Sequence, residues 1–287
     1  MSAVPPAEVS VSLVLPVYDG ARFLERSLYK AREWLSRRAG ESELIIVDDG
    51  SGDATPAILR AFAAESGDRR PRVRCLRNPI NRGKGYSVRR GLLAARGQLR
   101  LFSDADLTYP LGSFTHVLRT LRRGADIAVA CRVHEDSRYV VAPDFFRYIY
   151  TRHNAGRVFN WLVRATVVRE LRDTQAGLKG FRASVVEDLF PRLTQDGFSF
   201  DVELLFLAQR RGYRVEEVPV TYHYRKEPST VDFARDTFEM CADLARIRLR
   251  HARGAYALDA PVEPPEARAE RDACPDEVSP DPEPRRD

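Results

Sequence analysis

Two aspartates with one residue between them, Asp104 and Asp106, follow a short apolar run that ends at Ser103. In an extended chain, residues i and i+2 point to the same side, so both carboxylates can face one point just beyond the strand. Carboxylate oxygens are the ligands that Mg²⁺ and Mn²⁺ prefer, with positions left open for water and phosphate. An Asp-rich turn closed by Pro110 is the structural alternative. The pattern therefore predicts either a two-carboxylate metal site or a turn.

A second acidic segment follows a predicted strand over residues 43–47. A carboxylate at such a strand end, here Asp49, can accept hydrogen bonds from a nucleotide base or from ribose hydroxyls. Asp53 can instead cap the helix that is predicted to begin at Thr55. The two interpretations are compatible, with Asp49 binding a nucleotide and Asp53 capping the helix.

A third segment, Arg82-Gly83-Lys84-Gly85, places two cations among two glycines. Glycine lets the backbone approach a ligand closely, and the cations can meet a diphosphate. The segment is not a Walker loop, because the G-x-x-x-x-G-K-[ST] spacing is absent. The structural alternative is a basic turn before a helix.

Apolar, β-branched runs alternate with helical patterns through the first half of the chain. The predicted strands are 9–17, 43–47, 73–76, 97–102 and 127–130. The predicted helices are 21–38, 55–64 and 86–95. This alternation predicts a doubly wound, mostly parallel sheet, in which ligands bind at the carboxyl ends of the strands. All three polar segments fall at those ends.

The second half of the chain is predicted to add an edge strand, a further strand and several helices. The loop over residues 172–181 leads into the edge strand, and residues 213–224 alternate like a strand. The predicted helices are 148–169, 185–192, 202–211 and 231–253.

The composition is that of a globular protein, with 44% hydrophobic and 30% charged residues among 287. No apolar run reaches the roughly 20 residues of a membrane-spanning helix, and the first residues lack the pattern of a signal peptide. The four cysteines are scattered, which indicates neither a structural zinc site nor a disulfide framework. These observations favour a cytoplasmic protein.

The net charge of +5 conceals an acidic tail on a basic body. Residues 261–287 carry nine acidic and four basic side chains, so the rest of the chain carries +10. A basic body suits an anionic partner such as a nucleotide, a lipid phosphate or a membrane face. No nucleic-acid-binding motif is present, so no nucleic-acid partner is expected.

Five motifs in this order and spacing resemble family 2 glycosyltransferases with the GT-A fold: VLPVYDG, IIVDDGSGD, NRGKGYSVRRG, SDADLTYP and DTQAGLKGF. The likeness is greatest to the dolichyl-phosphate or polyprenyl-phosphate β-glucosyltransferase and mannosyltransferase branch, with DTQAGLKGF resembling the glucosyltransferase side. The resemblance implies one α/β GT-A domain over residues 10–255, a doubly wound, Rossmann-like mixed sheet flanked by helices. Residues 1–9 would be an extension, and residues 256–287 a disordered, acidic, Pro-rich tail.

The resemblance also implies roles for the residues that match the motifs. The nucleotide base and ribose would be lined by Pro16, Tyr18, Asp19 and Asp49. Asp104 and Asp106 would hold Mg²⁺ or Mn²⁺ against the diphosphate, and Lys84 would lie near the diphosphate or the base, with Asp106 and Lys84 acting in catalysis.

On the acceptor side, the resemblance places Arg132 and Arg152 against a phosphate. Gln175, Gly177 and Lys179 would shape the sugar and acceptor pocket. Asp201 occupies the position where many family members carry a general base. The structural alternatives are ion pairs for the two arginines, a strand-edge charge for Lys179 and a helix N-cap for Asp201.

Three positions depart from the family pattern. Gly20 stands where an acidic residue is common, and Asp19 replaces an asparagine. Thr108 stands where mannosyltransferases often carry glutamine, which argues against mannose as the donor sugar. A hydrophobic anchor is also absent from the printed sequence, which argues against stable membrane anchoring.

The expected reaction is inverting transfer of a hexose, with UDP-glucose favoured as donor, to a polyprenyl phosphate. A phosphate acceptor has a second pKa of about 6 and is already ionised, so Asp201 is needed as a base only if the acceptor is a hydroxyl. Two alternatives stay open: a glycosyltransferase with a soluble acceptor, and a nucleotide-sugar binding protein without catalysis. The Arg-rich amphipathic helices predicted at 148–168 and 231–253 suit peripheral contact with the inner membrane face, or packing on the sheet.

Overall fold

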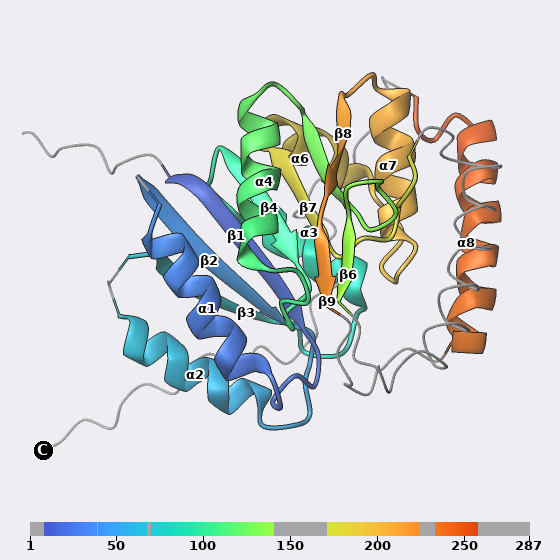
Figure 1. The fold of residues 1–287 in the computed structure, drawn as a ribbon. Helices are drawn as coiled ribbons and strands as arrows, with labels where there is room; N and C mark the ends of the chain where they lie inside the picture. Colours follow the sequence, from blue (N-terminus) through green and yellow to red (C-terminus); the bar gives the residue numbers. More distant parts are fainter. Residues whose placement is uncertain (1–8, 39, 68–69, 141–170, 224–232, 258–287) are drawn as a thin grey trace, which may run out of the picture.

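A computed structural model describes residues 9–38, 40–67, 70–140, 171–223 and 233–257. These residues form a seven-stranded sheet with helices on both faces (Figure 1). The predicted helix at 148–169, Arg152, the tail from residue 258 and most of the extension lie outside the described residues.

The sheet has the strand order β3-β2-β1-β4-β7-β5-β8. Its strands are β1 (Val9–Val17), β2 (Glu41–Asp48), β3 (Arg72–Arg77), β4 (Leu99–Ser103), β5 (Ile127–Cys131), β7 (Leu178–Arg182) and β8 (Val215–Pro219). β7 runs antiparallel to β4 and β5, and the other pairs are parallel. The expectation of a doubly wound, mixed sheet is confirmed.

The prediction that β7 is an edge strand is wrong, because the strand lies between β4 and β5. Its residues are buried on both faces of the sheet, apart from the half-buried Arg182. A Cβ atom at Gly180 would come within 2.5 Å of Val117 on the helix above, so glycine permits this close packing.

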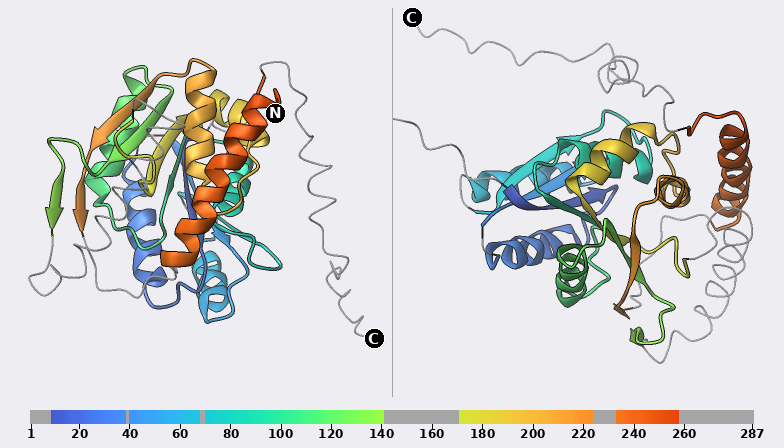
Figure 2. Two further views of the ribbon diagram at one scale, coloured as in Figure 1. Left: turned by 90° about the vertical axis from the view of Figure 1, so that its right-hand side faces the viewer. Right: turned by 90° about the horizontal axis from the view of Figure 1, so that it is seen from above.

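Helices cover both faces of the sheet. On one face lie α1 (Leu24–Ser36) and α4 (Leu111–Arg122), with α2 (Thr55–Ser66) packed against α1 and β3. On the other lie α3 (Lys84–Ala94) and α6 (Ala183–Leu189), as the view from above makes clear (Figure 2). α4 is absent from the sequence-based prediction, although Phe114 and Leu118 on its buried side have helical spacing.

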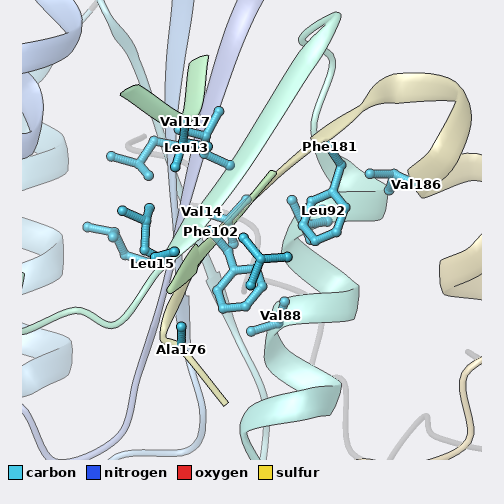
Figure 3. Packing of buried hydrophobic residues seen from close by; sticks show 14 of the residues in the cluster. Leu13, Val14, Leu15, Val88, Leu92, Phe102, Val117, Ala176, Phe181 and Val186 are labelled. Carbon is cyan, nitrogen blue, oxygen red and sulfur yellow. The ribbon is translucent and has the colours of Figure 1, made fainter. Parts of the chain in front are cut away.

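The core forms where the strand side chains alternate between these two layers (Figure 3). Leu13 and Leu15 lie on the side of Val117, whereas Val14 lies on the side of α3. A Cβ atom at Gly91 in α3 would lie 2.3 Å from Val14, so this glycine sets how closely α3 approaches β1. This packing fixes the strand ends that carry the polar loops.

The predicted strand at 213–224 is two strands, β8 and β9 (Thr221–His223), and β9 pairs in parallel with β6 (Arg138–Val140). The break falls after Pro219, where the Val220 N–H donates to the Ser137 hydroxyl at 2.9 Å. The remaining elements are η2 (Phe190–Arg192), α7 (Phe200–Arg210) and α8 (Phe233–Ala252). Along the described stretches of chain, no helix combines the length and the apolar character required to cross a bilayer.

Candidate active site

The site lies at the carboxyl ends of the parallel strands, where β7 begins. Ser103, the last residue of β4, pairs with Leu178, the first residue of β7. The Asp104 N–H donates to the Gly177 carbonyl at 3.0 Å and extends this pairing by one residue. The loop before β7 and the Asp104–Asp106 loop therefore lie side by side, although more than 60 residues separate them.

Lys84 and Asp104 form an ion pair of 2.5 Å between Nζ and Oδ1. Lys84 is the first residue of α3, following Gly83, whose φ of 99° is one that glycine adopts without strain. Burial alone would lower the pKa of Lys84, but Asp104 and the carboxylates of Asp201 and Asp106 raise it, so the ammonium stays charged. The sequence analysis placed Lys84 and the aspartate pair at strand ends on one edge of the sheet, and the structure brings Lys84 into contact with Asp104.

Asp106 is held in place by Thr108. Its Oδ1 accepts hydrogen bonds from the Thr108 hydroxyl at 2.5 Å and from the Thr108 N–H at 3.0 Å. Burial and the neighbouring carboxylate of Asp104 raise the pKa of Asp106. Thr108 stands where mannosyltransferases often carry glutamine, and here it orients the second carboxylate.

Gly177 lies directly against the Asp104 carboxylate. A Cβ atom at this position would sit 1.8 Å from Asp104 Oδ2, which no side chain could tolerate. The Gly177 N–H donates to the Tyr109 hydroxyl at 3.2 Å, so the backbone is fixed there. Gly177 thus lies against the predicted ion ligand Asp104, and its place in the sugar and acceptor pocket stays a prediction.

The residues present fit a divalent ion that shares its ligands with the substrate. Asp104 and Asp106 supply hard oxygen atoms, and the Asp104 carboxylate can occupy its position because residue 177 has no side chain. Within the described ranges no three His, Cys, Asp or Glu side chains are grouped to hold a metal. Two protein carboxylates would therefore leave the remaining positions for diphosphate oxygens and water.

The loop after β1, with Tyr18 and Asp19, is fastened to the loop after β2. The Asp19 N–H donates to the Ser51 hydroxyl at 3.0 Å, and Asp19 Oδ1 accepts from the Gly52 N–H at 2.9 Å. Tyr18 is exposed at this edge, and Pro16 is half-buried in β1. A Cβ atom at Gly20 would lie 2.5 Å from Val17, so the tight fit there excludes the acidic side chain common in the family.

Asp49 has a structural task that the sequence did not reveal. Its Oδ1 accepts from the Asn78 side-chain amide at 2.6 Å and from the Arg82 N–H at 3.0 Å, and its Oδ2 accepts from the Gly83 N–H at 2.8 Å. Asp49 is 4% exposed, so it braces the loop that presents Lys84. Its direct contact with a nucleotide stays a prediction. The prediction that Asp53 caps α2 is wrong, because Ala54 is the N-cap residue of this helix; Asp53 lies one residue earlier, where its Oδ1 accepts from the Thr55 N–H at 2.8 Å.

The loop before α7 also stabilises the first turn of α3, where Lys84 lies. The carboxylate of Glu203, which is fully buried, accepts from the Thr194 and Gln195 N–H groups, both at 2.8 Å, and from the Tyr256 hydroxyl at 2.6 Å. Asp196, the residue after Gln195, accepts a hydrogen bond through its backbone carbonyl from the Tyr86 N–H, in the first turn of α3, at 3.1 Å. The sequence analysis gave Glu203 no role in the site.

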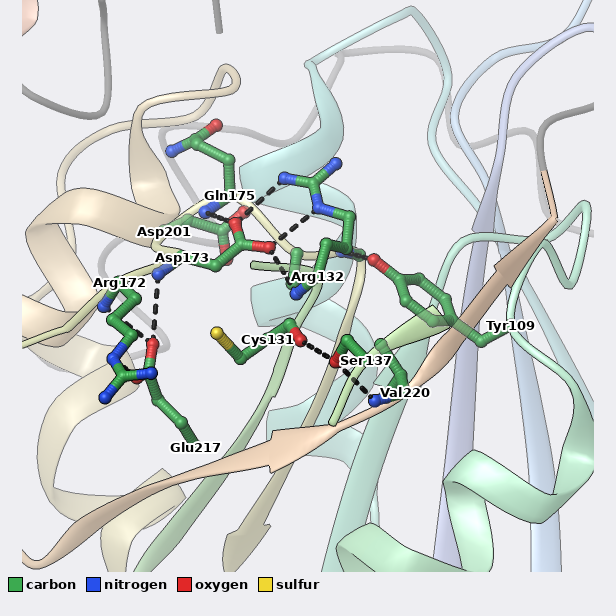
Figure 4. A network of polar contacts seen from close by, with 12 residues as sticks. Tyr109, Cys131, Arg132, Ser137, Arg172, Asp173, Gln175, Asp201, Glu217 and Val220 are labelled. Carbon is green, nitrogen blue, oxygen red and sulfur yellow. Dashed lines mark hydrogen bonds and ion pairs between the residues drawn. The ribbon is translucent and has the colours of Figure 1, made fainter. Parts of the chain in front are cut away.

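Arg132, which the sequence analysis assigned to the acceptor phosphate, forms an ion pair with Asp173 (Figure 4). Its Nε donates to Oδ2 at 2.7 Å and its Nη2 to Oδ1 at 2.9 Å, a two-pronged contact. Burial alone would raise the pKa of Asp173, but Arg132 outweighs burial and lowers it. The sequence analysis did not assign Asp173 to the site, although Asp173 is the first residue of the DTQ motif that also contains Gln175.

We expect Asp173→Asn to lower the free energy of unfolding by about 3 kcal/mol at neutral pH, because it leaves Arg132 without its partner. The lowered pKa of Asp173 means that this stability is present above the pKa of the unfolded chain and is lost as the pH falls through the folded-state pKa. Urea denaturation at neutral and acidic pH measures the difference, with Asp136→Asn at an 81% exposed carboxylate as the control. A difference that stays constant on acidification would contradict the prediction.

The strand-edge alternative for Lys179 is wrong, because β7 is an interior strand, and its part in shaping the sugar and acceptor pocket stays a prediction. Lys179 is fully buried in β7, and its Nζ lies 2.6 Å from Asp201 Oδ1. The N-cap alternative for Asp201 is also wrong, because Ser199 is the N-cap of α7 and Asp201 lies inside its first turn. Burial lowers the pKa of Lys179 and raises that of Asp201, against their mutual attraction.

Gln175 lies beside Asp201 and Asp173 (Figure 4). The backbone N–H of Gln175 donates to Asp173 Oδ1 at 3.3 Å. Its side-chain Nε2 is buried and has no hydrogen-bond partner in the described part of the chain. A buried donor without a partner is costly, and a bound ligand oxygen would satisfy it. This supports the prediction that Gln175 faces a substrate.

Comparison with known proteins places the chain in a family. Residues 12–190 match the model of glycosyl transferase family 2, and the chain belongs to this family. It is 31% identical to a human dolichyl-phosphate beta-glucosyltransferase over 87% of this chain and 78% of that protein. The corresponding enzyme of Dictyostelium discoideum is 30% identical over 88% of this chain and 78% of its own length.

Solved structures of glucosyl-3-phosphoglycerate synthase from Mycobacterium tuberculosis share the fold. One holds Mn²⁺, UDP and glucosyl-3-phosphoglycerate, with a TM-score of 0.60 and 17% identity over 83% of this chain and 80% of that one. Another holds Mg²⁺ and UDP, with a TM-score of 0.58 and 17% identity over 84% and 78% of the two chains. At this identity the likeness establishes the GT-A-like architecture.

Proposed function

We propose that this protein is an inverting, metal-dependent glucosyltransferase that moves glucose from UDP-glucose to a polyprenyl phosphate. The observation that carries the proposal is the meeting of Lys84, Asp104 and Asp106 at the carboxyl edge of the sheet. The relatives named dolichyl-phosphate beta-glucosyltransferase support the donor sugar and the acceptor class. Solved neighbours that hold UDP with Mn²⁺ or Mg²⁺ support the base and the ion.

The donor half of the reaction rests on charge. Mg²⁺ or Mn²⁺ bound at Asp104 and Asp106 would counter the negative charge that grows on the departing diphosphate. Lys84 supplies fixed positive charge at the same place, and its ion pair with Asp104 keeps it oriented before substrate arrives. Pro16, Tyr18 and Asp19 lie at the carboxyl end of β1, the strand beside β4, where the base and ribose would bind.

The transfer step needs a nucleophile on the acceptor and a leaving group on the donor. A phosphate monoester is largely ionised at neutral pH, so its oxygen can attack the anomeric carbon without a base. A bond from that oxygen to the carbon forms, the bond from the carbon to the UDP oxygen breaks, and UDP leaves with the electron pair. One in-line displacement gives a β product from an α donor. Arg132, held by Asp173, and the unpaired amide of Gln175 are the described groups that would meet the acceptor or the sugar.

A donor screen tests the proposal. The purified protein is mixed with a short polyprenyl phosphate, Mg²⁺ or Mn²⁺, and UDP-glucose, UDP-galactose or GDP-mannose, and the products are identified by mass. We expect a hexosyl polyprenyl phosphate from UDP-glucose, and its loss when a chelator removes the ion.

Other outcomes of this screen would favour a different donor, a different acceptor or a protein without catalysis. Product from GDP-mannose alone would contradict the donor, and transfer only to a soluble sugar or glycerate would favour the soluble-acceptor alternative. Binding of UDP-glucose without hydrolysis or transfer would favour a binding protein.

Sedimentation with anionic and zwitterionic vesicles would test the proposed peripheral position on the inner membrane face.

A further inference from the structure

An almost completely buried charged pair lies beneath the candidate site. Lys179 comes from the interior strand β7 and Asp201 from the first turn of α7, and they are 0% and 2% exposed. Their Nζ and Oδ1 atoms are 2.6 Å apart. Taking two charges out of water is costly, so such a pair in the middle of a sheet points to a task beyond stability.

The ammonium of Lys179 joins three parts of the site. Besides Asp201, it donates to the Ala176 carbonyl at 2.8 Å, in the loop that enters β7. That loop carries Gln175 on one side of Ala176 and Gly177 on the other, and Gly177 lies against the Asp104 carboxylate. A shift of the ammonium would therefore reach the loop, α7 and the metal-side carboxylate together.

The charges around the pair come from α7, α3, the loop before β7 and the loop after β4. Lys179 faces Asp201 from α7, Lys84 from α3 and Asp173 from the loop before β7. Asp201 faces Lys179, Lys84 and Asp104. Removing Asp201 would leave Lys179 buried close to a second ammonium, so Asp201 has the surroundings of a counter-ion.

We propose that Lys179 is a positioning residue that holds the 173–177 loop and α7 in place, and that Asp201 serves as its counter-ion and not as a base in the transfer. The inference rests on the proposed function, since an ionised phosphate acceptor needs no base. It assigns a new task to the position where many members of the family carry a base.

A double-variant cycle separates a counter-ion from a base. We expect Lys179→Met and Asp201→Asn each to lower kcat for transfer to polyprenyl phosphate about a hundredfold, because each leaves a misplaced loop and an unpaired buried group. The double variant Lys179→Met/Asp201→Asn removes both charges, and we expect it to recover to within about tenfold of the wild type. Its urea denaturation midpoint should also rise above that of either single variant.

Two further variants sharpen the cycle. Lys179→Arg keeps the charge and should retain more activity than Lys179→Met. The exposed pair Glu33 and Arg37 offers a matched control, since its side chains are 60% and 74% exposed, and Glu33→Gln/Arg37→Met should leave kcat and the midpoint unchanged.

The proposal is overturned if the double variant does not recover activity beyond Asp201→Asn, whether it is folded or not. It is also overturned if either single variant keeps the activity of the wild type. If the wild type forms no glucosyl polyprenyl phosphate, the proposed function fails by itself. The same cycle then applies to denaturation midpoints and UDP affinity, and recovery of both in the double variant would still support the positioning role of Lys179.

Discussion

Replacing Asp106 by alanine is expected to lower kcat for glucosyl transfer about a thousandfold. The change removes one of the two carboxylates that would hold the ion, and it leaves the Thr108 hydroxyl and N–H without their acceptor. The remaining carboxylate, Asp104, is already engaged by Lys84. Charge on the departing diphosphate would then be countered by Lys84 alone.

The measurement is steady-state transfer of glucose from UDP-glucose to polyprenyl phosphate at several Mn²⁺ concentrations. Asp136→Ala, at an exposed carboxylate in the turn before β6, is the matched control and should keep the activity of the wild type. A loss of less than tenfold in Asp106→Ala at saturating Mn²⁺ would contradict the role of Asp106 as an ion ligand.

The second large effect is expected from the smallest substitution, Gly177→Ala. The added methyl group would sit 1.8 Å from Asp104 Oδ2 and 2.5 Å from its carboxyl carbon, so either the carboxylate or the loop must move. A displacement of about 1 Å at a reacting centre lowers a rate about a hundredfold. We therefore expect Gly177→Ala to lose about a hundredfold in kcat, although no charge or hydrogen-bonding group is removed.

Transfer rates and the affinity for Mn²⁺ in the presence of UDP measure this effect. The control is Gly112→Ala near the start of α4, where an added Cβ would meet nothing within 4 Å. Alanine is the better helix former, so the control should keep its activity and be stabilised slightly. Equal activity in the two alanine variants would show that Asp104 needs no such space beside it.

Much of the fold could be predicted because its signals are local. The uncharged run of β1 and the apolar spacing of α1 reveal a buried strand and an amphipathic helix without knowledge of the rest of the chain. Since ligands bind at the carboxyl ends of parallel strands, the alternation of strands and helices along the chain is enough to predict that Lys84 and Asp104 lie at the same edge of the sheet.

What could not be predicted depends on contacts between distant segments. The insertion of β7 between β4 and β5 pairs Leu99 with Arg182, and nothing near residue 180 specifies that partner. A charged lysine in a short strand suggests an exposed edge, because the carboxylate of Asp201 that allows its burial lies 22 residues further on.

The same limit applies to individual roles in the site. The sequence leaves open whether Arg132 binds a phosphate or forms an ion pair, and its partner Asp173, which binds two of its nitrogens, lies 41 residues away. Asp49 reads as a nucleotide ligand, whereas its carboxylate also braces the loop before Lys84. Residue type and spacing predict which side chains gather at the site, and the pairing among them appears only in three dimensions.

The most direct test of the account offers the purified protein UDP-glucose and Mn²⁺ with equal concentrations of a short polyprenyl phosphate and the corresponding free polyprenol. We predict that only the phosphate is glucosylated, and that the product, identified by mass and by the coupling constant of its anomeric proton, is the β anomer. Glucosylation of the alcohol in preference to the phosphate, or an α-linked product, would contradict inverting transfer to a phosphate acceptor.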